Sequence, residues 1–206
     1  NNKGSILSFN QNSKLKWKTN NYSKNEKKLE PIISMTHNNK QLFVSDNLSK
    51  IYSVNLINGK ILWSKKNSLP FNSVIKFFDN KIFVVDANNN LNCFSAKDGS
   101  LLWQHKTEKS FINSSKKLPI LIKDEIVTFS NSLGDITAID INNGSLIWQK
   151  STQNSNIYED IMTLKMSNLI LNNESIYFSN NKNQFYSIDF NTGITNWTQE
   201  INSNVK

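Results

Sequence analysis

The sequence has little of several residue types that build active sites and recognition surfaces. Its 206 residues include no arginine, one cysteine and two histidines. Specific base readout and phosphate clamping depend on the bidentate arginine fork, so the absence of arginine argues against sequence-specific nucleic-acid binding. The single cysteine, Cys93, excludes an internal disulfide and a cysteine-based zinc cluster. Every hydrophobic run is broken by polar residues within about ten positions, which excludes a membrane-spanning helix.

Apolar and aromatic residues are nevertheless plentiful enough for a packed core. They make up 37% and 11% of the chain, and their burial, at ~25 cal/mol per Å², offsets the conformational entropy lost on folding. The net charge of +8 comes from 24 lysines against 16 acidic residues, and such an excess alone supports only nonspecific attraction to polyanions. The 35 asparagines are typical of an AT-rich genome.

A motif that ends in tryptophan recurs along the whole chain. Four copies match position for position: KIYSVNLINGKILW (50–63), NLNCFSAKDGSLLW (90–103), DITAIDINNGSLIW (135–148) and QFYSIDFNTGITNW (184–197). Each has a glycine four residues before its tryptophan, and a fifth copy, GSILSFNQNSKLKW (4–17), has Ser13 in place of the glycine. The tryptophans are 46, 40, 45 and 49 residues apart, which is the period of a four-stranded propeller blade.

Each copy predicts a β-hairpin. In the last one, side chains alternate from Phe185 to Phe190, a turn follows at 191–193, and a second strand leads to Trp197. The turn glycines supply a residue that tolerates positive φ where the chain reverses. We expect Asn55, Asp140 and Asp189, four residues before their glycines, to cap the turns through side-chain oxygens.

A second pair of apolar runs precedes each of the four full copies. We expect these as further strands at 32–35 with 42–44, 74–78 with 82–85, 120–122 with 126–129, and 169–171 with 176–178. The predicted fold is therefore all-β, a β-propeller of four-stranded antiparallel blades. Its blades occupy 31–66, 70–106, 118–150 and 165–200, and residues 1–20 supply the last two strands of another. These four and a half blades predict a single partial propeller over 1–206, belonging to a larger ring of seven or eight blades.

The pattern Asp140-x-x-Asn143-Gly144-x-x-x-Trp148 resembles the tryptophan-docking motif of PQQ-like β-propeller repeats. In that family the tryptophan of one blade locks onto the neighbouring blade. The resemblance therefore implies a structural docking role for nine residues: Trp17, Trp63, Trp103, Trp148, Trp197, Gly59, Gly99, Gly144 and Gly193.

Within this family the chain is most similar to the BamB-like lipoproteins of the outer-membrane β-barrel assembly machinery. Two long segments carry that similarity, 106–118 before Pro119 and 151–167 before the last blade. The resemblance implies a noncatalytic periplasmic, outer-membrane-associated scaffold without cofactor or metal, held by an N-terminal lipid anchor that this chain lacks. It also implies binding to a POTRA-type domain of the assembly channel and, at exposed edge strands, to nascent outer-membrane proteins.

The BamB-like contact pattern is Leu-x-Leu-Arg in the first segment and Asp-x-Asp in the second. Matched by position, the first pattern falls on Phe111, Ile112, Asn113 and Ser114, which keep only its leading apolar position. The second pattern falls near Leu164 and Met166, several residues after the acidic pair Glu159 and Asp160. The expected partner-binding residues are Phe111, Ile112, Asn113, Ser114, Glu159 and Asp160.

Two alternatives stay open at the sequence level. The family includes quinoprotein dehydrogenases, which need PQQ, Ca²⁺, a catalytic Asp and commonly a vicinal cysteine pair, whereas Cys93 stands alone. The second alternative is a ligand-binding propeller of a surface sensor or adhesion protein, because propellers host many functions. The acid–base candidates His37 and His105 are expected on solvated surface, and no catalytic residue is predicted.

Overall fold

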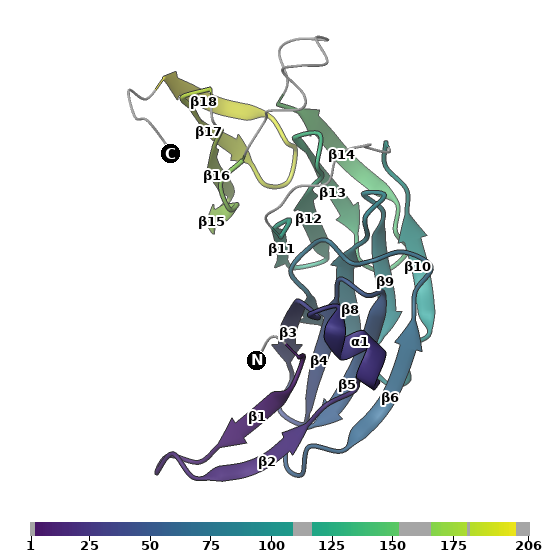
Figure 1. The fold of residues 1–206 in the computed structure, drawn as a ribbon. Coiled ribbons are helices and arrows are strands. Elements are labelled where there is room, and N and C mark those ends of the chain that lie inside the picture. Colours follow the sequence, from purple (N-terminus) through teal and green to yellow (C-terminus); the bar gives the residue numbers. More distant parts are fainter. Residues whose placement is uncertain (1–2, 109–116, 153–165, 181, 201–206) are drawn as a thin grey trace. The chain divides into compact units, whose positions relative to one another are not determined.

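The computed structural model describes residues 3–108, 117–152, 166–180 and 182–200 (Figure 1). The chain divides into two compact units, residues 1–106 and 107–206. Both are built almost entirely from antiparallel strands, and each unit is described by itself.

The first unit contains a two-stranded sheet, a short helix and two four-stranded sheets. In chain order its elements are β1 (Ile6–Phe9), β2 (Leu15–Thr19), α1 (Lys24–Lys28), β3 (Ile33–His37), β4 (Gln41–Asp46), β5 (Lys50–Asn55), β6 (Ile61–Lys66), β7 (Lys76–Phe78), β8 (Lys81–Val85), β9 (Leu91–Ser95) and β10 (Leu101–His105). Each four-stranded sheet is a meander in which neighbours in sequence pair in space, as expected for short connections.

The second unit contains two further meanders of the same kind. Their strands are β11 (Ile120–Lys123), β12 (Ile126–Ser130), β13 (Asp135–Asp140) and β14 (Leu146–Ser151), then β15 (Ile170–Asn172), β16 (Ser175–Ser179), β17 (Gln184–Asp189) and β18 (Thr195–Glu200). All eight hairpin strands of the four full copies and all eight upstream strands thus form where the periodicity predicts them, with ends that differ by a few residues.

The hydrophobic cores lie between consecutive sheets within each unit. In the first unit, Phe43 and Ile51 of one sheet pack with Ile82 and Val84 of the next, all fully buried. In the second unit, Ile136 and Ala138 pack with Ile176, Phe178 and Ile188. Strands that are covered on both faces bury consecutive residues, which explains the continuous apolar runs of β4 and β8. The strands β3 and β7 beside them are only partly buried.

A small residue faces every repeat tryptophan across its hairpin. The five pairs are Ser8–Trp17, Ser53–Trp63, Cys93–Trp103, Ala138–Trp148 and Ser187–Trp197. In each hairpin the register shifts next to this pair, so a β-bulge accompanies every tryptophan. Directly opposed side chains start only ~5 Å apart, and a small residue therefore leaves room for the indole. This requirement gives Cys93 a packing role.

Three of the tryptophans lie against the turn of the hairpin that follows in the chain. The contacts join Trp17 to Gly59, Trp63 to Gly99 and Trp148 to Gly193. In each case the indole Nε1 also donates a hydrogen bond to the carbonyl oxygen three residues before the glycine, on Leu56, Ala96 and Phe190, at 3.0–3.1 Å. Trp103 packs beside Phe83 with ring centroids 5.9 Å apart, and Trp197 is 42% exposed beside Tyr177 and Phe185.

The turn caps expected from the repeat are confirmed. The side-chain oxygen of Asn55 accepts hydrogen bonds from the backbone N–H groups of residues 57 and 58, and Asp140 and Asp189 do the same in their own turns. The Thr192 hydroxyl and N–H groups lower the pKa of Asp189, because they stabilise its carboxylate. The carboxylates of Asp140 and Asp189 therefore have a structural role as turn caps.

A second repeated turn, between the second and third strands of each full sheet, was not predicted. Its first residue is Asp46, Asp86, Asn131 or Asn180, whose side-chain oxygen accepts from the N–H groups two and four residues later. The residue three positions on always has positive φ: Ser49, Asn89, Gly134 and Asn183. Asparagine and aspartate tolerate such turns because their side chains bond the nearby backbone.

The helix α1 was also not predicted. Ser23 and Glu26 form a capping box, in which the Ser23 hydroxyl accepts from the Glu26 N–H and the Glu26 carboxylate accepts from the Ser23 N–H. Lys50 of β5 reaches both Glu26 carboxylate oxygens, at 2.8 and 2.9 Å. The helix is thereby attached to the sheet β3–β6.

Candidate partner-binding surface

The six expected partner-binding residues, Phe111, Ile112, Asn113, Ser114, Glu159 and Asp160, lie outside the described residues. The points where their two segments leave and rejoin the fold are described, however. The first segment leaves after β10 in the first unit, and the remaining points, residues 117–119, 152 and 166–167, lie in the second unit.

The first segment rejoins the sheet β11–β14 through a buried apolar residue. Leu118 is 5% exposed, and the carbonyl of Pro119 accepts a hydrogen bond from the N–H of Ser130 at 3.4 Å. Ser130 is the last residue of β12. The end of the first segment is therefore held beside the turn that joins β12 to β13.

The second segment leaves the same sheet at the same turn. The hydroxyl of the buried Thr152 donates to the carbonyl of Gly134 at 2.6 Å, directly after β14 ends. The chain is described again at Met166, whose sulfur lies 4.0 Å from the Thr152 hydroxyl and which forms a β-bridge with Asn180. The end of the first segment and the start of the second thus lie at one end of the sheet, around residues 131–134.

The turn at residues 131–134, beside these two segment ends, is held by hydrogen bonds. Asn131 accepts from the N–H groups of Leu133 and Asp135, and its amide donates to the Asp135 carboxylate at 3.0 Å. Both Asn131 and Asp135 are buried. A fixed turn flanked by two long segments is a common design for a binding surface, since the scaffold positions the loops and the loops make the contacts. We call residues 118–119, 131–134, 152 and 166–167 the loop platform.

The opposite end of the sheets in this unit carries an ionic contact instead. The ammonium group of Lys123 bonds the Glu174 carboxylate and, at 3.1 Å, the Asn173 carbonyl. It also lies 5.7 Å from the centre of the Phe190 ring. This Lys123 bond and a second bond from Asn191 lower the pKa of Glu174. These contacts join two neighbouring sheets and hold them together.

The two acid–base candidates, His37 and His105, lie on different strands of the first unit. His37 is the last residue of β3 and is exposed, with its Nδ1 atom 3.1 Å from the Asn38 carbonyl. His105 ends β10 and is half-buried. Among the residues that the structure describes, no group of three or more His, Cys, Asp and Glu side chains gathers as a metal site would require. In the same residues, no helix has the length and apolar character needed to cross a membrane.

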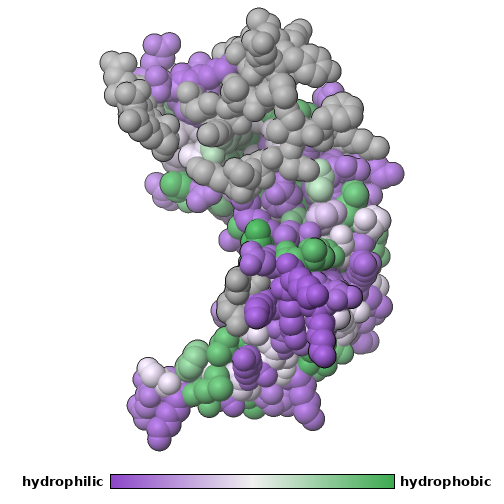
Figure 2. All heavy atoms as spheres, viewed as in Figure 1, coloured by the Kyte–Doolittle hydropathy of each residue, from purple (hydrophilic) through white to green (hydrophobic). Residues whose placement is uncertain are grey.

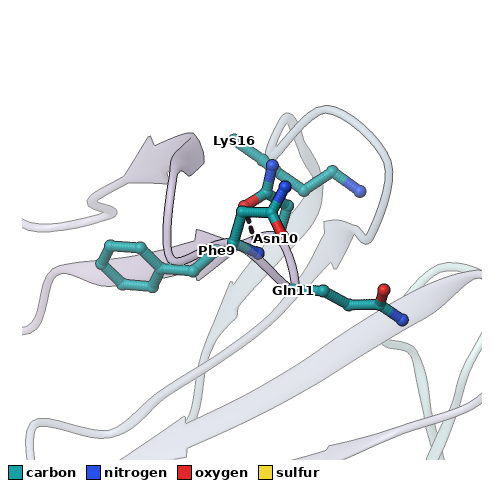
Figure 3. A pocket seen from close by; sticks show the side chains of 5 residues that line it. Phe9, Asn10, Gln11 and Lys16 are labelled. Atoms are coloured by element: carbon teal, nitrogen blue, oxygen red, sulfur yellow. Dashed lines mark hydrogen bonds between the residues drawn. The ribbon is translucent and has the colours of Figure 1, made fainter.

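A surface pocket near the N-terminal end of the chain was not predicted from the repeat. An open pocket lies at the tip of the β1–β2 hairpin, lined by Phe9, Asn10, Gln11, Asn12 and Lys16 (Figure 3). Asn10 shapes the tip, because its side-chain oxygen accepts from the N–H groups of residues 12 and 14. Ser13 has φ +57°, so it takes the left-handed conformation that glycine adopts in the other hairpins.

Comparison with solved structures supports the propeller. BamB from Moraxella catarrhalis matches 98% of this chain with a TM-score of 0.79 and 14% sequence identity, over 61% of its own length. The computationally designed protein Ika8 matches 98% of this chain with a TM-score of 0.76 and 12% identity, over 58% of its length. The chain therefore spans about three fifths of these structures, and the predicted all-β propeller of four-stranded antiparallel blades is confirmed.

Comparison with curated proteins finds no match. A family model described as outer membrane protein assembly factor BamB, in contrast, matches residues 2–206. This match covers nearly the whole chain, including all five hairpins and both long segments. The chain belongs to the family of the outer membrane protein assembly factor BamB.

Proposed function

We propose that this protein is a noncatalytic periplasmic scaffold that assists the assembly of outer-membrane β-barrel proteins. In this proposal it is associated with the outer membrane and binds a POTRA-type domain of the assembly channel through the loop platform and its two segments. Family membership supports the general role. The observation that carries the proposed binding surface is that the first segment ends, and the second begins, beside one turn of the sheet β11–β14.

The proposed interface has an apolar centre and a polar rim. Phe111 and Ile112 would pack into a groove of the partner, because buried aromatic and aliphatic anchors contribute most of the affinity in such contacts. Asn113, Ser114, Glu159 and Asp160 would surround them and bond at the rim. The first segment ends beside the bonded turn at residues 131–134 and the second begins there, so these two parts would face the partner from one side of the sheet.

Calorimetric titration with the POTRA region of the assembly channel from the same organism tests the proposal. Saturable binding is expected, and replacing Phe111 and Ile112 together by Ala should weaken it by ~1–3 kcal/mol. The matched control replaces Leu62 and Leu102 by Ala. These two exposed residues lie on β6 and β10 of the other unit, and their loss should leave the affinity unchanged.

A parallel titration with PQQ and Ca²⁺ tests the noncatalytic part of the proposal. No heat of binding is expected, whereas saturable binding of PQQ would place the protein among the quinoprotein dehydrogenases. Unchanged POTRA affinity in the Phe111 and Ile112 variant would contradict the placement of the interface. Absence of POTRA binding by the parent protein would contradict the scaffold role itself.

A further inference from the structure

Two of the hairpin turns place an asparagine directly before the turn glycine. The pairs are Asn58–Gly59 between β5 and β6 and Asn143–Gly144 between β13 and β14. Glycine has no Cβ atom, so its backbone nitrogen can approach the side chain of the preceding residue more closely than that of any other residue type. Each of these asparagines therefore stands beside a nucleophile of its own chain.

Both turns hold the asparagine side chain close to the following peptide bond. Asn58 Oδ1 accepts a hydrogen bond from the N–H of Lys60 at 3.0 Å, and Asn143 Oδ1 accepts one from the N–H of Ser145 at 2.8 Å. Each bond spans the glycine between its two residues, so it keeps the side-chain amide near the glycine nitrogen. It also places a donor where negative charge develops on the oxygen when the side-chain carbonyl carbon is attacked.

Solvent has access to the two asparagines, whereas the glycine nitrogens are bonded. Both asparagine side chains are exposed, and the face of the first unit drawn in Figure 2 is largely hydrophilic. The Gly59 N–H donates to the Asn55 carbonyl at 2.9 Å, and the Gly144 N–H donates to the Asp140 carbonyl at 3.0 Å. These bonds have to open before the nitrogen reacts, so the reaction proceeds from a briefly opened turn.

The corresponding turns of the other two four-stranded sheets are not expected to react in this way. Asp98 precedes Gly99, but the N–H and hydroxyl groups of Ser100 lower the pKa of Asp98 to about 2, because they stabilise its carboxylate. An ionised carboxylate is a poor target for a nucleophile. Thr192 precedes Gly193 and has no carbonyl group in its side chain.

We propose that Asn58 and Asn143 are sites of spontaneous deamidation. The glycine nitrogen gives its proton to hydroxide and attacks the asparagine Cγ atom, and the new C–N bond closes a succinimide ring. The bond from Cγ to the side-chain nitrogen breaks, and ammonia leaves with a proton taken from water. Water then opens the ring by cleaving one of its two C–N bonds. Cleavage at Cγ gives aspartate, and cleavage at the main-chain carbonyl carbon gives isoaspartate, whose backbone runs through Cβ and Cγ.

Isoaspartate at position 58 would weaken a contact between two sheets. It lengthens the backbone of the turn beside Gly59, against which the Trp17 indole packs. Trp17 also donates to the Leu56 carbonyl of the same turn at 3.0 Å. This contact favours the closed turn and thereby slows the reaction, so tryptophan docking and deamidation at position 58 oppose each other. The inference rests on the turns alone and is independent of partner binding.

Peptide mapping by mass spectrometry tests the proposal on the folded protein, sampled during storage in mildly alkaline buffer. Asn58 and Asn143 should deamidate at least about tenfold faster than Asn142 and Asn191, because a side chain on the following residue hinders its backbone nitrogen. Asn142 and Asn191 are matched controls. Both are exposed and lie in the same kind of turn, but neither precedes a glycine. Rates at Asn58 and Asn143 no higher than at these controls would overturn the proposal.

Variants connect the modification to the tryptophan contact. Trp17→Ala should raise the rate at Asn58 several-fold, because the turn then opens more often, and it should leave the rate at Asn143 in the other unit unchanged. Storage should lower the urea midpoint of the parent and of the control variant Asn142→Gln. Asn58→Gln combined with Asn143→Gln should keep its initial midpoint, because glutamine does not form the succinimide ring. Equal losses of midpoint in all three proteins would contradict the loosening of the sheets by deamidation.

Discussion

Trp17 and Gly59 are in direct contact: a Cβ atom built on Gly59 would lie 2.7 Å from Cδ2 and Cε3 of the Trp17 indole. The same relationship joins Trp63 to Gly99 and Trp148 to Gly193, at 2.6 Å. Each glycine therefore has two functions. It takes positive φ in its own turn, and it leaves a flat surface on which the tryptophan of the preceding hairpin packs. This contact between neighbouring sheets explains why a glycine stands in the hairpin turn that the preceding tryptophan meets.

Replacing Gly59 by Ala should lower the free energy of unfolding by at least ~2 kcal/mol. The left-handed conformation alone costs ~1–2 kcal/mol for a residue with Cβ, and the collision with the rigid indole adds to that cost. Urea denaturation measures the change. Ser13→Gly is the matched variant, since Ser13 has φ +57° and is exposed, and it should be neutral or stabilising. Equal destabilisation by both changes would contradict the contact with Trp17.

Strands and hairpins could be predicted because the repeat presents the same pattern four times over. The helix α1 could not, since its five residues carry no apolar period, and only the Ser23 and Glu26 capping box indicates it. The turns that begin at Asp46 and Asn131 could not be predicted because the chain contains 35 asparagines. In such a composition, one more Asn or Asp near a strand end does not indicate a turn. Only the hydrogen bonds distinguish these residues from their neighbours.

Less of the candidate site could be predicted than of the fold. Phe111 and Glu159 were chosen by position in a family pattern, and they lie outside the described residues. The role of the turn at residues 131–134 depends on two hydrogen bonds, one that the Pro119 carbonyl accepts from Ser130 and one that Thr152 donates to Gly134. These bonds join positions far apart in sequence.

Replacing Trp148 by Ala should destabilise the protein by ~3–5 kcal/mol, because it opens a cavity between two sheets. Trp148 is 8% exposed and its Nε1 atom donates to the Phe190 carbonyl. Trp197→Ala is the matched variant: its indole is 42% exposed, and we expect a loss of ~1 kcal/mol. Thermal and urea denaturation of both variants check the difference. A melting midpoint unchanged by Trp148→Ala would show that this tryptophan does not hold the sheets together.

Cys93 should tolerate small substitutions and reject large ones. It is fully buried opposite Trp103, where the other hairpins have Ser or Ala. Cys93→Ala should therefore cost ~1 kcal/mol, whereas Cys93→Phe should cost ~3 kcal/mol or more through overpacking. Urea denaturation compares the two variants with the parent, and similar losses for both would contradict the steric explanation.

The Cys93 thiol should also be unreactive in the folded protein. Burial raises its pKa to about 12, so the thiolate that reacts with disulfide reagents is scarce near neutral pH. Ellman's reagent at pH 8 should modify no thiol in native protein and one in denatured protein. Rapid modification of the native protein would show that Cys93 is accessible.

Acid should remove the contribution of Glu26 to stability. Its contacts with Lys50 and the Ser23 N–H lower the pKa of Glu26 to about 2, from 4.5 for an unperturbed group. Unfolding therefore takes up a proton between about pH 4.5 and 2, and the stabilisation is complete above this range and lost as the pH falls through it. Solvent screening of this partly exposed pair limits the effect to under ~1 kcal/mol.

The variant Glu26→Gln isolates this effect, because glutamine retains the capping box but not the charge. The measured quantity is the difference in unfolding free energy between the parent and the variant, from urea denaturation at pH values from 7 to 2. Other carboxylates with lowered pKa, such as Asp98 and Asp189, occur in both proteins and cancel in the difference. The parent should be more stable at pH 7, and the difference should fall to near zero at pH 2. A difference that does not change with pH would show that the ion pair between Glu26 and Lys50 does not lower the pKa of the carboxylate in the folded state.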